Sequence, residues 1–215
     1  MIIIAIGHRA RSGKDTISGH LVKHFGFRRY GLADLLKQSV NLVTGWNDDH
    51  AYGSLKEEVC PVWNIKPRTS YQLVGTECYR KIMGQDVWAK ALRIQIERDA
   101  AKTDQPDQFR AVISDLRFEK GEVEMVKDMG GKLWRVDRPG LPDLIVPPKT
   151  AVGRTVDHFT GRAKTWSHQS EYDLADFAGW DAIIKNDSTL EALYERAEQE
   201  LHKVLNVIDG PEEQS

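Results

Sequence analysis

The chain has 215 residues, and its 30 lysines and arginines nearly balance its 32 aspartates and glutamates, for a net charge of -2. This length suits one domain with a substantial core, and the charge balance gives no global electrostatic reason to bind a nucleic-acid backbone. Two cysteines, Cys60 and Cys78, are too few for a disulfide framework or a cysteine-rich metal cluster.

The first apolar run, Ile2 to Ile6, is too short to span a membrane, and neither its length nor its flanks fit a signal peptide. We therefore expect a soluble, cytoplasmic protein with no membrane partner and no direct nucleic-acid partner.

The same apolar run is typical of a strand buried on both faces of a parallel sheet. A turn with glycine and lysine follows, and then a segment with helical spacing. The start of such a helix offers unpaired N–H groups and a positive dipole end to an anion, so a phosphate is the expected ligand. The residues predicted to bind the ATP phosphates are Arg11, Ser12, Gly13, Lys14, Asp15 and Thr16.

The loop departs from the usual pattern G-x-x-x-x-G-K-[ST] at two positions. His8 stands at the first glycine position, and Asp15 stands where a magnesium-binding hydroxyl normally falls, with Thr16 one residue later. The alternative is a strand, a basic surface loop and a helix without a ligand. The order of strand, turn and helix favours the phosphate loop.

Further elements follow in alternation. We expect strands at 27–31, 110–114, 132–136 and 180–185, and helices at 33–43, 54–59, 70–82, 87–101, 122–129 and 190–207. This alternation predicts an α/β fold with a mainly parallel sheet flanked by helices.

The expected organisation is a single domain over residues 1–208, followed by a polar tail at 209–215. Two inserted regions interrupt its core, which comprises 1–45, 102–140 and 180–208. Residues 46–101 are predicted to bind the acceptor substrate. Residues 141–170, which contain several prolines and cations, are predicted to form a lid.

Asp115 and Arg117 follow the apolar run Ala111–Ile113. Ligand groups of parallel sheets lie at the carboxyl ends of the strands, so Asp115 is a candidate site residue. Arg117 can turn into the same crevice and bind phosphate, although a surface ion pair would also explain it.

Eight segments carry a resemblance that spans most of the chain. They are RSGKDT at 11–16, LADLLK at 32–37, QLVGTECYR at 72–80, DVW at 86–88, SDLRF at 114–118, RPG at 138–140, HQSE at 168–171 and WDAIIKND at 180–187. In order and spacing they resemble the phage deoxynucleoside monophosphate kinases and, more remotely, the phosphomevalonate kinases of the same P-loop kinase group.

That resemblance implies a P-loop kinase fold and transfer of the ATP γ-phosphoryl to the 5′-phosphate of a deoxynucleoside monophosphate, a step of nucleotide biosynthesis. The protein would act in the host cytoplasm if a phage encodes it. Lys14 would follow the moving phosphoryl, with Arg117 as a further catalytic cation. Asp15, Thr16 and Asp115 would serve Mg²⁺ directly or through water.

The resemblance also implies acceptor-binding residues, each with a plainer alternative. Arg80 would bind the monophosphate, or pair at its helix end. Gln72 would contact the base, and Lys37 the acceptor phosphate, or both would lie on solvated faces. Trp88 would line the acceptor site, or belong to the core.

The remaining candidates lie late in the chain. Arg154 and Arg162 would stabilise the transition state from the lid, as arginine fingers do. His168 and Glu171 match the HxSE pattern of the family and would bind the acceptor, although His168 could be a structural histidine. Asn186 would border the adenine pocket, or simply occupy a turn.

Two other functions stay open at this point. One is a P-loop kinase for another small phosphorylated or hydroxyl acceptor, and the other is a nucleotide-binding regulatory module that transfers nothing to a small molecule. The sequence leaves open the preferred base and the oligomeric state, including a homodimer.

Overall fold

The computed structural model describes residues 1–141 and 172–209. Its five-stranded sheet has the order β2-β3-β1-β4-β5, and every neighbouring pair is parallel. The strands are β1 (Ile2–Gly7), β2 (Arg28–Tyr30), β3 (Arg110–Leu116), β4 (Lys132–Asp137) and β5 (Ala182–Lys185). The predicted α/β fold with a mainly parallel sheet is confirmed.

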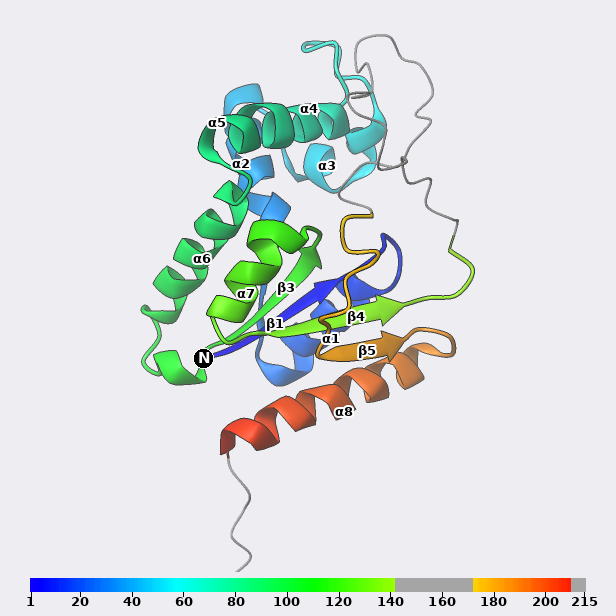
Figure 1. Cartoon of the computed structure of the whole chain (residues 1–215). Coiled ribbons are helices and arrows are strands. Elements are labelled where there is room, and N and C mark those ends of the chain that lie inside the picture. Colours follow the sequence, from blue (N-terminus) through cyan, green and yellow to red (C-terminus); the bar gives the residue numbers. More distant parts are fainter. Residues whose placement is uncertain (142–171, 210–215) are drawn as a thin grey trace, which may run out of the picture.

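Helices cover both faces of this sheet (Figure 1). One face carries α1 (Lys14–Phe25) and α8 (Leu190–Asp209), and the other carries α6 (Val87–Ala100), α7 (Glu124–Asp128) and the start of α2 (Leu32–Thr44). Strand β1 is buried throughout because alternate side chains enter the two cores. The continuous apolar run at the N-terminus therefore marks the central strand.

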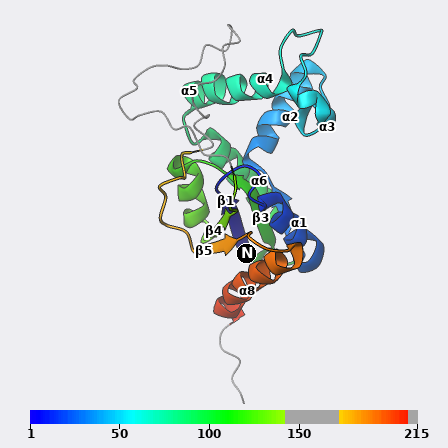
Figure 2. The ribbon, with the colours of Figure 1, turned by 90° about the vertical axis from the view of Figure 1, so that its right-hand side faces the viewer.

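A helical region lies at one end of the molecule, with the sheet in the middle and α8 at the opposite end (Figures 1 and 2). After α2, its elements are α3 (Asp48–Ala51), the 3₁₀ turn η1 (Ser54–Glu57), α4 (Pro67–Leu73), the π-helix η2 (Val74–Arg80) and α5 (Lys81–Met83). A separate apolar cluster of Leu36, Val40, Trp46, Ala51, Tyr71 and Trp88 holds this region together.

The structure corrects several predicted elements. Helix α3 was not predicted, and the single helix expected at 70–82 consists of α4, η2 and α5 in succession. Helix α6 was assigned to the acceptor-binding region, yet its Leu92 and Ile96 lie in the core cluster of the sheet. Strand β3 continues to Leu116, so Asp115 belongs to the strand itself.

Two short elements flank β3. The 3₁₀ turn η3 (Pro106–Gln108) precedes the strand, and the irregular turn η4 (Glu119–Val123) leads from it into α7. Within the described residues, no helix combines the length and apolar character needed to cross a membrane.

Candidate functional site

The loop between β1 and α1 has a strongly curved backbone. His8, Arg11 and Gly13 have positive φ angles of 91°, 63° and 112°. Left-handed residues within such a turn direct successive N–H groups toward a common centre, which is the geometry of an anion-binding nest. Helix α1 begins directly after Gly13 and adds the positive end of its dipole.

His8 adopts its left-handed conformation without the freedom of glycine, at a cost of about 1–3 kcal/mol. Its side chain is anchored on β4: Nδ1 lies 3.2 Å from Asp137 Oδ1 and 3.4 Å from the carbonyl oxygen of Val136. Burial lowers the pKa of His8, as does the nearby charge of Arg135, while Asp137 opposes the shift. The loop thus keeps its curvature with histidine at the first glycine position.

Asn186 fixes the other end of the loop. Its Nδ2 donates to the carbonyl oxygen of Ser12 at 2.8 Å. A Cβ on Gly13 would lie 2.6 Å from the same nitrogen, so the loop and Asn186 approach too closely for a side chain there. Asn186 was predicted to border an adenine pocket, and the structure places its amide against the phosphate loop.

Ser12 is fully buried, and its hydroxyl has no hydrogen-bond partner among the described residues. An unpaired buried hydroxyl costs roughly 1–3 kcal/mol, so such groups generally have a partner, which can be a ligand or a water molecule. Its position in the loop makes a phosphate oxygen a suitable partner.

The other predicted loop residues lie around the same turn. Lys14 Nζ reaches back across the loop to the carbonyl oxygen of Arg9 at 2.5 Å. Arg138 Nη1 donates to the carbonyl oxygen of Arg11 at 3.3 Å. Asp15 is exposed and Thr16 half-buried in the first turn of α1.

A charged hollow of about 390 Å³ adjoins this loop. Its lining residues come from the loop and from the ends of β4 and β5: His8, Arg9, Arg135, Asp137, Arg138, Pro139, Lys185 and Asp187. The lysines and arginines outnumber the two aspartates, so the hollow suits a ligand that carries negative charge.

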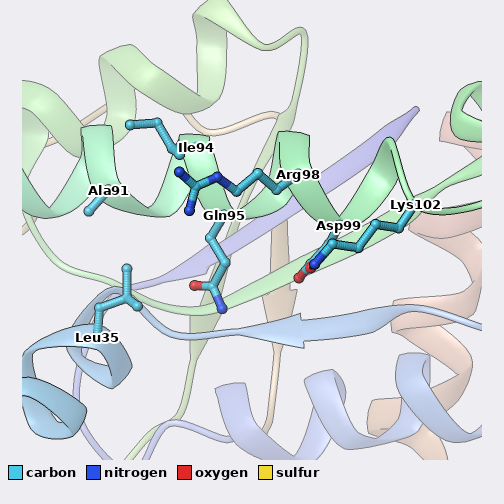
Figure 3. A pocket seen from close by; sticks show the side chains of 7 residues that line it. All are labelled: Leu35, Ala91, Ile94, Gln95, Arg98, Asp99 and Lys102. Atoms are coloured by element: carbon cyan, nitrogen blue, oxygen red, sulfur yellow. The ribbon is translucent and has the colours of Figure 1, made fainter.

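A larger hollow of about 520 Å³ lies elsewhere, between Leu35 of α2 and the exposed side of α6 (Figure 3). Its most buried charged group, Asp99, is already held by the Tyr30 hydroxyl at 2.9 Å and by Arg28 at 3.2 Å. This second hollow brings none of the predicted site residues together.

The strand register places the end of β3 beside the phosphate loop. Gly7, the last residue of β1, is the parallel partner of Leu116. Asp115 therefore lies next to the start of the loop, and Arg117 is the first residue after β3. This register brings the loop and the carboxyl end of β3 together, as the sequence predicts.

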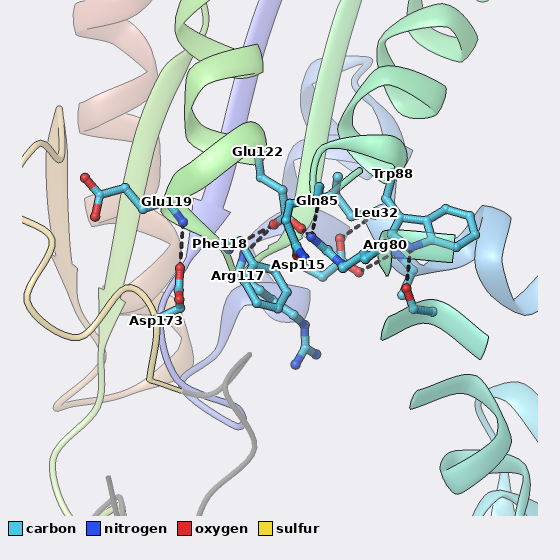
Figure 4. Close-up of polar contacts among 12 residues, drawn as sticks. Leu32, Arg80, Gln85, Trp88, Asp115, Arg117, Phe118, Glu119, Glu122 and Asp173 are labelled. Carbon is cyan, nitrogen blue, oxygen red and sulfur yellow. Dashed lines mark hydrogen bonds and ion pairs between the residues drawn. The ribbon is translucent and has the colours of Figure 1, made fainter. Parts of the chain in front are cut away.

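Asp115 organises the start of α2. Its two carboxylate oxygens accept hydrogen bonds from the backbone N–H of Leu32 at 2.6 Å and of Ala33 at 3.1 Å (Figure 4). A carboxylate at a helix N-terminus pairs with the unbonded N–H groups and the dipole. A carboxylate has about four lone-pair sites, so these two bonds leave acceptor capacity for a cation.

Three cations gather near Asp115. Burial lowers the pKa of Lys37 to about 8, with smaller contributions from the charges of Lys56 and Arg117, while Asp34 and Asp115 oppose the shift. We call Lys37, together with Lys56, Asp115 and Arg117, whose charges act on it, the acceptor crevice.

Lys37 is further held by an aromatic ring. Its Nζ lies 3.8 Å from the centre of the Tyr52 ring, and the Tyr52 hydroxyl donates to Asp34 Oδ1 at 2.6 Å. Lys56 was missed by sequence reasoning because it lies in the short helix expected at 54–59 and belongs to none of the motifs.

Arg80 has a different environment from the one predicted. Its guanidinium is only 8% exposed and pairs with Glu122 at 2.9 Å, donates to the Gln85 carbonyl oxygen at 2.6 Å and lies over the Phe118 ring (Figure 4). The described contacts of Arg80 are thus internal, in line with the alternative of an ion pair at its helix end.

Trp88 is also buried, and its Nε1 donates to the Gly75 carbonyl oxygen at 3.3 Å. It packs in the core of the helical region, as the alternative for this residue stated. Gln72 is half-buried on α4. The predicted residues Arg154, Arg162, His168 and Glu171 lie outside the described residues.

The residues predicted to serve a metal ion carry oxygen donors. The carboxylates of Asp15 and Asp115 and the Thr16 hydroxyl are hard ligands of the kind that Mg²⁺ prefers. Among the residues the structure describes, no group of three or more histidine, cysteine, aspartate or glutamate side chains could by itself hold a metal. This composition suits an ion that is bound together with substrate phosphates.

Comparisons with solved structures define the fold class. The dephospho-CoA kinase from Campylobacter jejuni overlays with a TM-score of 0.50 at 14% sequence identity, over 95% of this chain and 98% of that chain. The chain therefore has a P-loop kinase fold.

A comparison of sequences gives a more specific relative. A curated protein of Acanthamoeba polyphaga mimivirus, described as "Putative deoxynucleotide monophosphate kinase", is 25% identical over 204 residues, which cover 90% of this chain and 93% of that protein. No protein-family model matches the chain.

Proposed function

We propose that this protein transfers the γ-phosphoryl group of ATP to the 5′-phosphate of a deoxynucleoside monophosphate. The single observation that carries the proposal is the parallel register of Gly7 with Leu116, which sets the phosphate loop beside the acceptor crevice. The description of the mimivirus relative supports this choice of acceptor class.

The loop supplies the donor half of the site. Its N–H groups, the α1 dipole and the buried Ser12 hydroxyl hold the ATP phosphates. Lys14 already reaches across the loop and adds a point charge for the phosphoryl that moves. The adjoining charged hollow accommodates another part of the same nucleotide.

The acceptor crevice supplies the other half. An oxygen of the acceptor phosphate attacks the γ-phosphorus, the bond from that phosphorus to the bridging β,γ-oxygen breaks, and ADP leaves. The protein needs no nucleophile of its own for this step. Lys37 and Arg117 bind the acceptor phosphate and offset its repulsion from ATP.

Mg²⁺ would be held by Asp115 and Thr16, with Asp15 acting through water, and would neutralise charge on the donor phosphates. Arg154 and Arg162, which lie outside the described residues, would stabilise the transition state as predicted from the sequence.

An acceptor screen tests this function. Purified protein with ATP and magnesium receives each of the four common deoxynucleoside monophosphates in turn, and release of ADP is followed by a coupled assay. We expect acceptor-dependent release with at least one of them. Release that depends only on another small phosphorylated compound would assign a different acceptor class. Release of ADP at the same rate with and without every acceptor would indicate a nucleotide-binding module.

A further inference from the structure

Glu122 is a buried carboxylate at the junction of two parts of the chain. Its side chain is 2% exposed. Oε1 accepts from Arg80 Nη2 at 2.9 Å, and Oε2 accepts from the backbone N–H groups of Arg117 at 2.9 Å and Phe118 at 3.0 Å (Figure 4). All of these partners are donors, so the ionised carboxylate satisfies them together.

Arg80 is held as firmly as its partner. Besides Glu122, it donates to the Gln85 carbonyl oxygen at 2.6 Å, and its guanidinium carbon lies 4.1 Å from the centre of the Phe118 ring. Arg80 ends the π-helix η2 of the helical region, whereas Glu122 lies in η4, directly after β3. The ion pair thus connects the helical region to the strand that carries Asp115.

The side chain of Arg117 leaves this cluster in another direction. Figure 4 shows the guanidinium of Arg117 pointing away from Glu122, while its main chain is bound to it. Two residues before Arg117, Asp115 binds the start of α2, the helix that carries Lys37, and the charge of Arg117 acts on Lys37. Glu122 therefore fixes the backbone of Arg117, while the guanidinium of Arg117 stays available to the acceptor crevice.

We propose that Glu122 is a positioning residue, which fixes the main chain of Arg117 and thereby presents the Arg117 guanidinium to the acceptor phosphate. Arg80 supports it by holding the carboxylate from the helical region. The role of Glu122 toward the acceptor phosphate rests on the proposed function, whereas its role in fixing the main chain of Arg117 does not.

Asp115 provides a parallel arrangement on the same strand. It accepts from the backbone N–H groups of Leu32 and Ala33 and so fixes the start of α2, the helix that carries Lys37. Two of the three crevice cations, Lys37 and Arg117, are thus placed by a carboxylate that binds main chain. A displacement of about 1 Å at such groups is enough to reduce catalysis about 10²-fold.

The test compares Glu122→Gln with Glu97→Gln. The first variant keeps the size of the side chain but replaces one acceptor oxygen by an NH₂ group. The single neutral oxygen that remains cannot accept from Arg80 and from the Arg117 and Phe118 amides at the same time. The second removes the charge of Glu97, which pairs with Arg93 at 2.8 Å on the exposed side of α6. It is the matched control for loss of one glutamate from an ion pair.

Hydrogen exchange at the Arg117 and Phe118 amides, followed by mass spectrometry, is the first readout. We expect exchange about tenfold faster in Glu122→Gln than in the native protein or the control, since a hydrogen bond to a neutral oxygen is weaker than one to a carboxylate by about that factor. Equal exchange would overturn the proposal, whatever the protein phosphorylates.

The second readout compares the KM for the acceptor with the KM for ATP. We expect the KM for the acceptor to rise about tenfold in Glu122→Gln with the KM for ATP unchanged. A lower melting temperature with both KM values unchanged would show a structural role alone and overturn the proposal. If no monophosphate is a substrate of the native protein, the proposed function fails, and amide exchange decides whether Glu122 fixes the main chain.

Arg80→Lys serves if Glu122→Gln does not fold. It keeps a cation beside Glu122 but cannot reproduce the fork that also reaches the Gln85 carbonyl oxygen. We expect a smaller change of the same kind in amide exchange and acceptor KM. Amide exchange and an acceptor KM equal to those of the native protein would contradict the proposal.

Discussion

The phosphate loop and the acceptor crevice lie side by side but are built in different ways. The loop takes its groups from consecutive residues, and its geometry comes from left-handed backbone at His8, Arg11 and Gly13. The crevice takes Lys37, Lys56 and Arg117 from separate elements, and two carboxylates bound to main chain set its geometry. Backbone substitutions should therefore damage the first region, and charge substitutions the second.

Removal of the loop lysine should have the largest effect. Lys14→Met deletes a charge aimed at the transferred phosphoryl, and we expect kcat to fall about 10²–10³-fold, as when a preorganised stabilising group is lost. Steady-state assays of ADP release measure it. Lys23→Met, in the exposed last turn of the same helix, is the control and should keep native kcat.

Removal of the crevice arginine should come next. Arg117→Ala deletes a charge-assisted contact with the acceptor phosphate, and we expect kcat/KM for the acceptor to fall roughly 10–100-fold. The KM for ATP should stay within a factor of about two, which sharpens the distinction between the two regions. Arg98→Ala on the exposed side of α6 is the control. An equal rise of both KM values would contradict separate donor and acceptor halves.

The charge of Lys37 should produce a pH dependence. Burial lowers its pKa to about 8, so the ammonium is charged below that pH and neutral above it. We expect kcat/KM for the acceptor to decline as pH rises through about 8. Lys37→Arg, which stays charged, should remove the decline, at a modest loss of activity. A decline that persists in the variant would assign it to another group.

The smallest effect should come from His8, where backbone and side chain can be separated. His8→Gly and His8→Ala both lose the contact with Asp137, but only glycine tolerates the positive φ without strain. We expect the alanine variant to be less stable than the glycine variant by about 1–2 kcal/mol, or roughly 2–8 °C in Tm. Equal melting temperatures would show that the loop relaxes to another conformation.

The difference between the two regions also explains what the sequence could predict. Ile2 to Thr16 carries its strand, turn and helix in local order, so this order was predicted from spacing alone. Strand β3 was predicted for the same reason, although it ends at Leu116 and not at residue 114. Each signal lies within one short stretch of chain.

The contacts that assemble the crevice leave no such local signal. Glu122 looks like any acidic residue at a helix start, and its pairing with Arg80 joins residues 42 positions apart. Arg80 was assigned to phosphate binding because its segment resembles a kinase motif, whereas tertiary packing gives it a buried partner. The π-helix η2 and helix α3 were missed because tertiary packing determines them: η2 packs against α2 and α4, and α3 packs against η1 and α4.

Transfer of label from γ-³²P-ATP tests the central claim most directly. The native protein is incubated with the labelled ATP, magnesium and the deoxynucleoside monophosphate that the screen selects, and the products are separated. We expect label in the deoxynucleoside diphosphate, formed in a one-to-one ratio with ADP and lost in Lys14→Met. Label that appears only in inorganic phosphate, at a rate independent of the monophosphate, would contradict it.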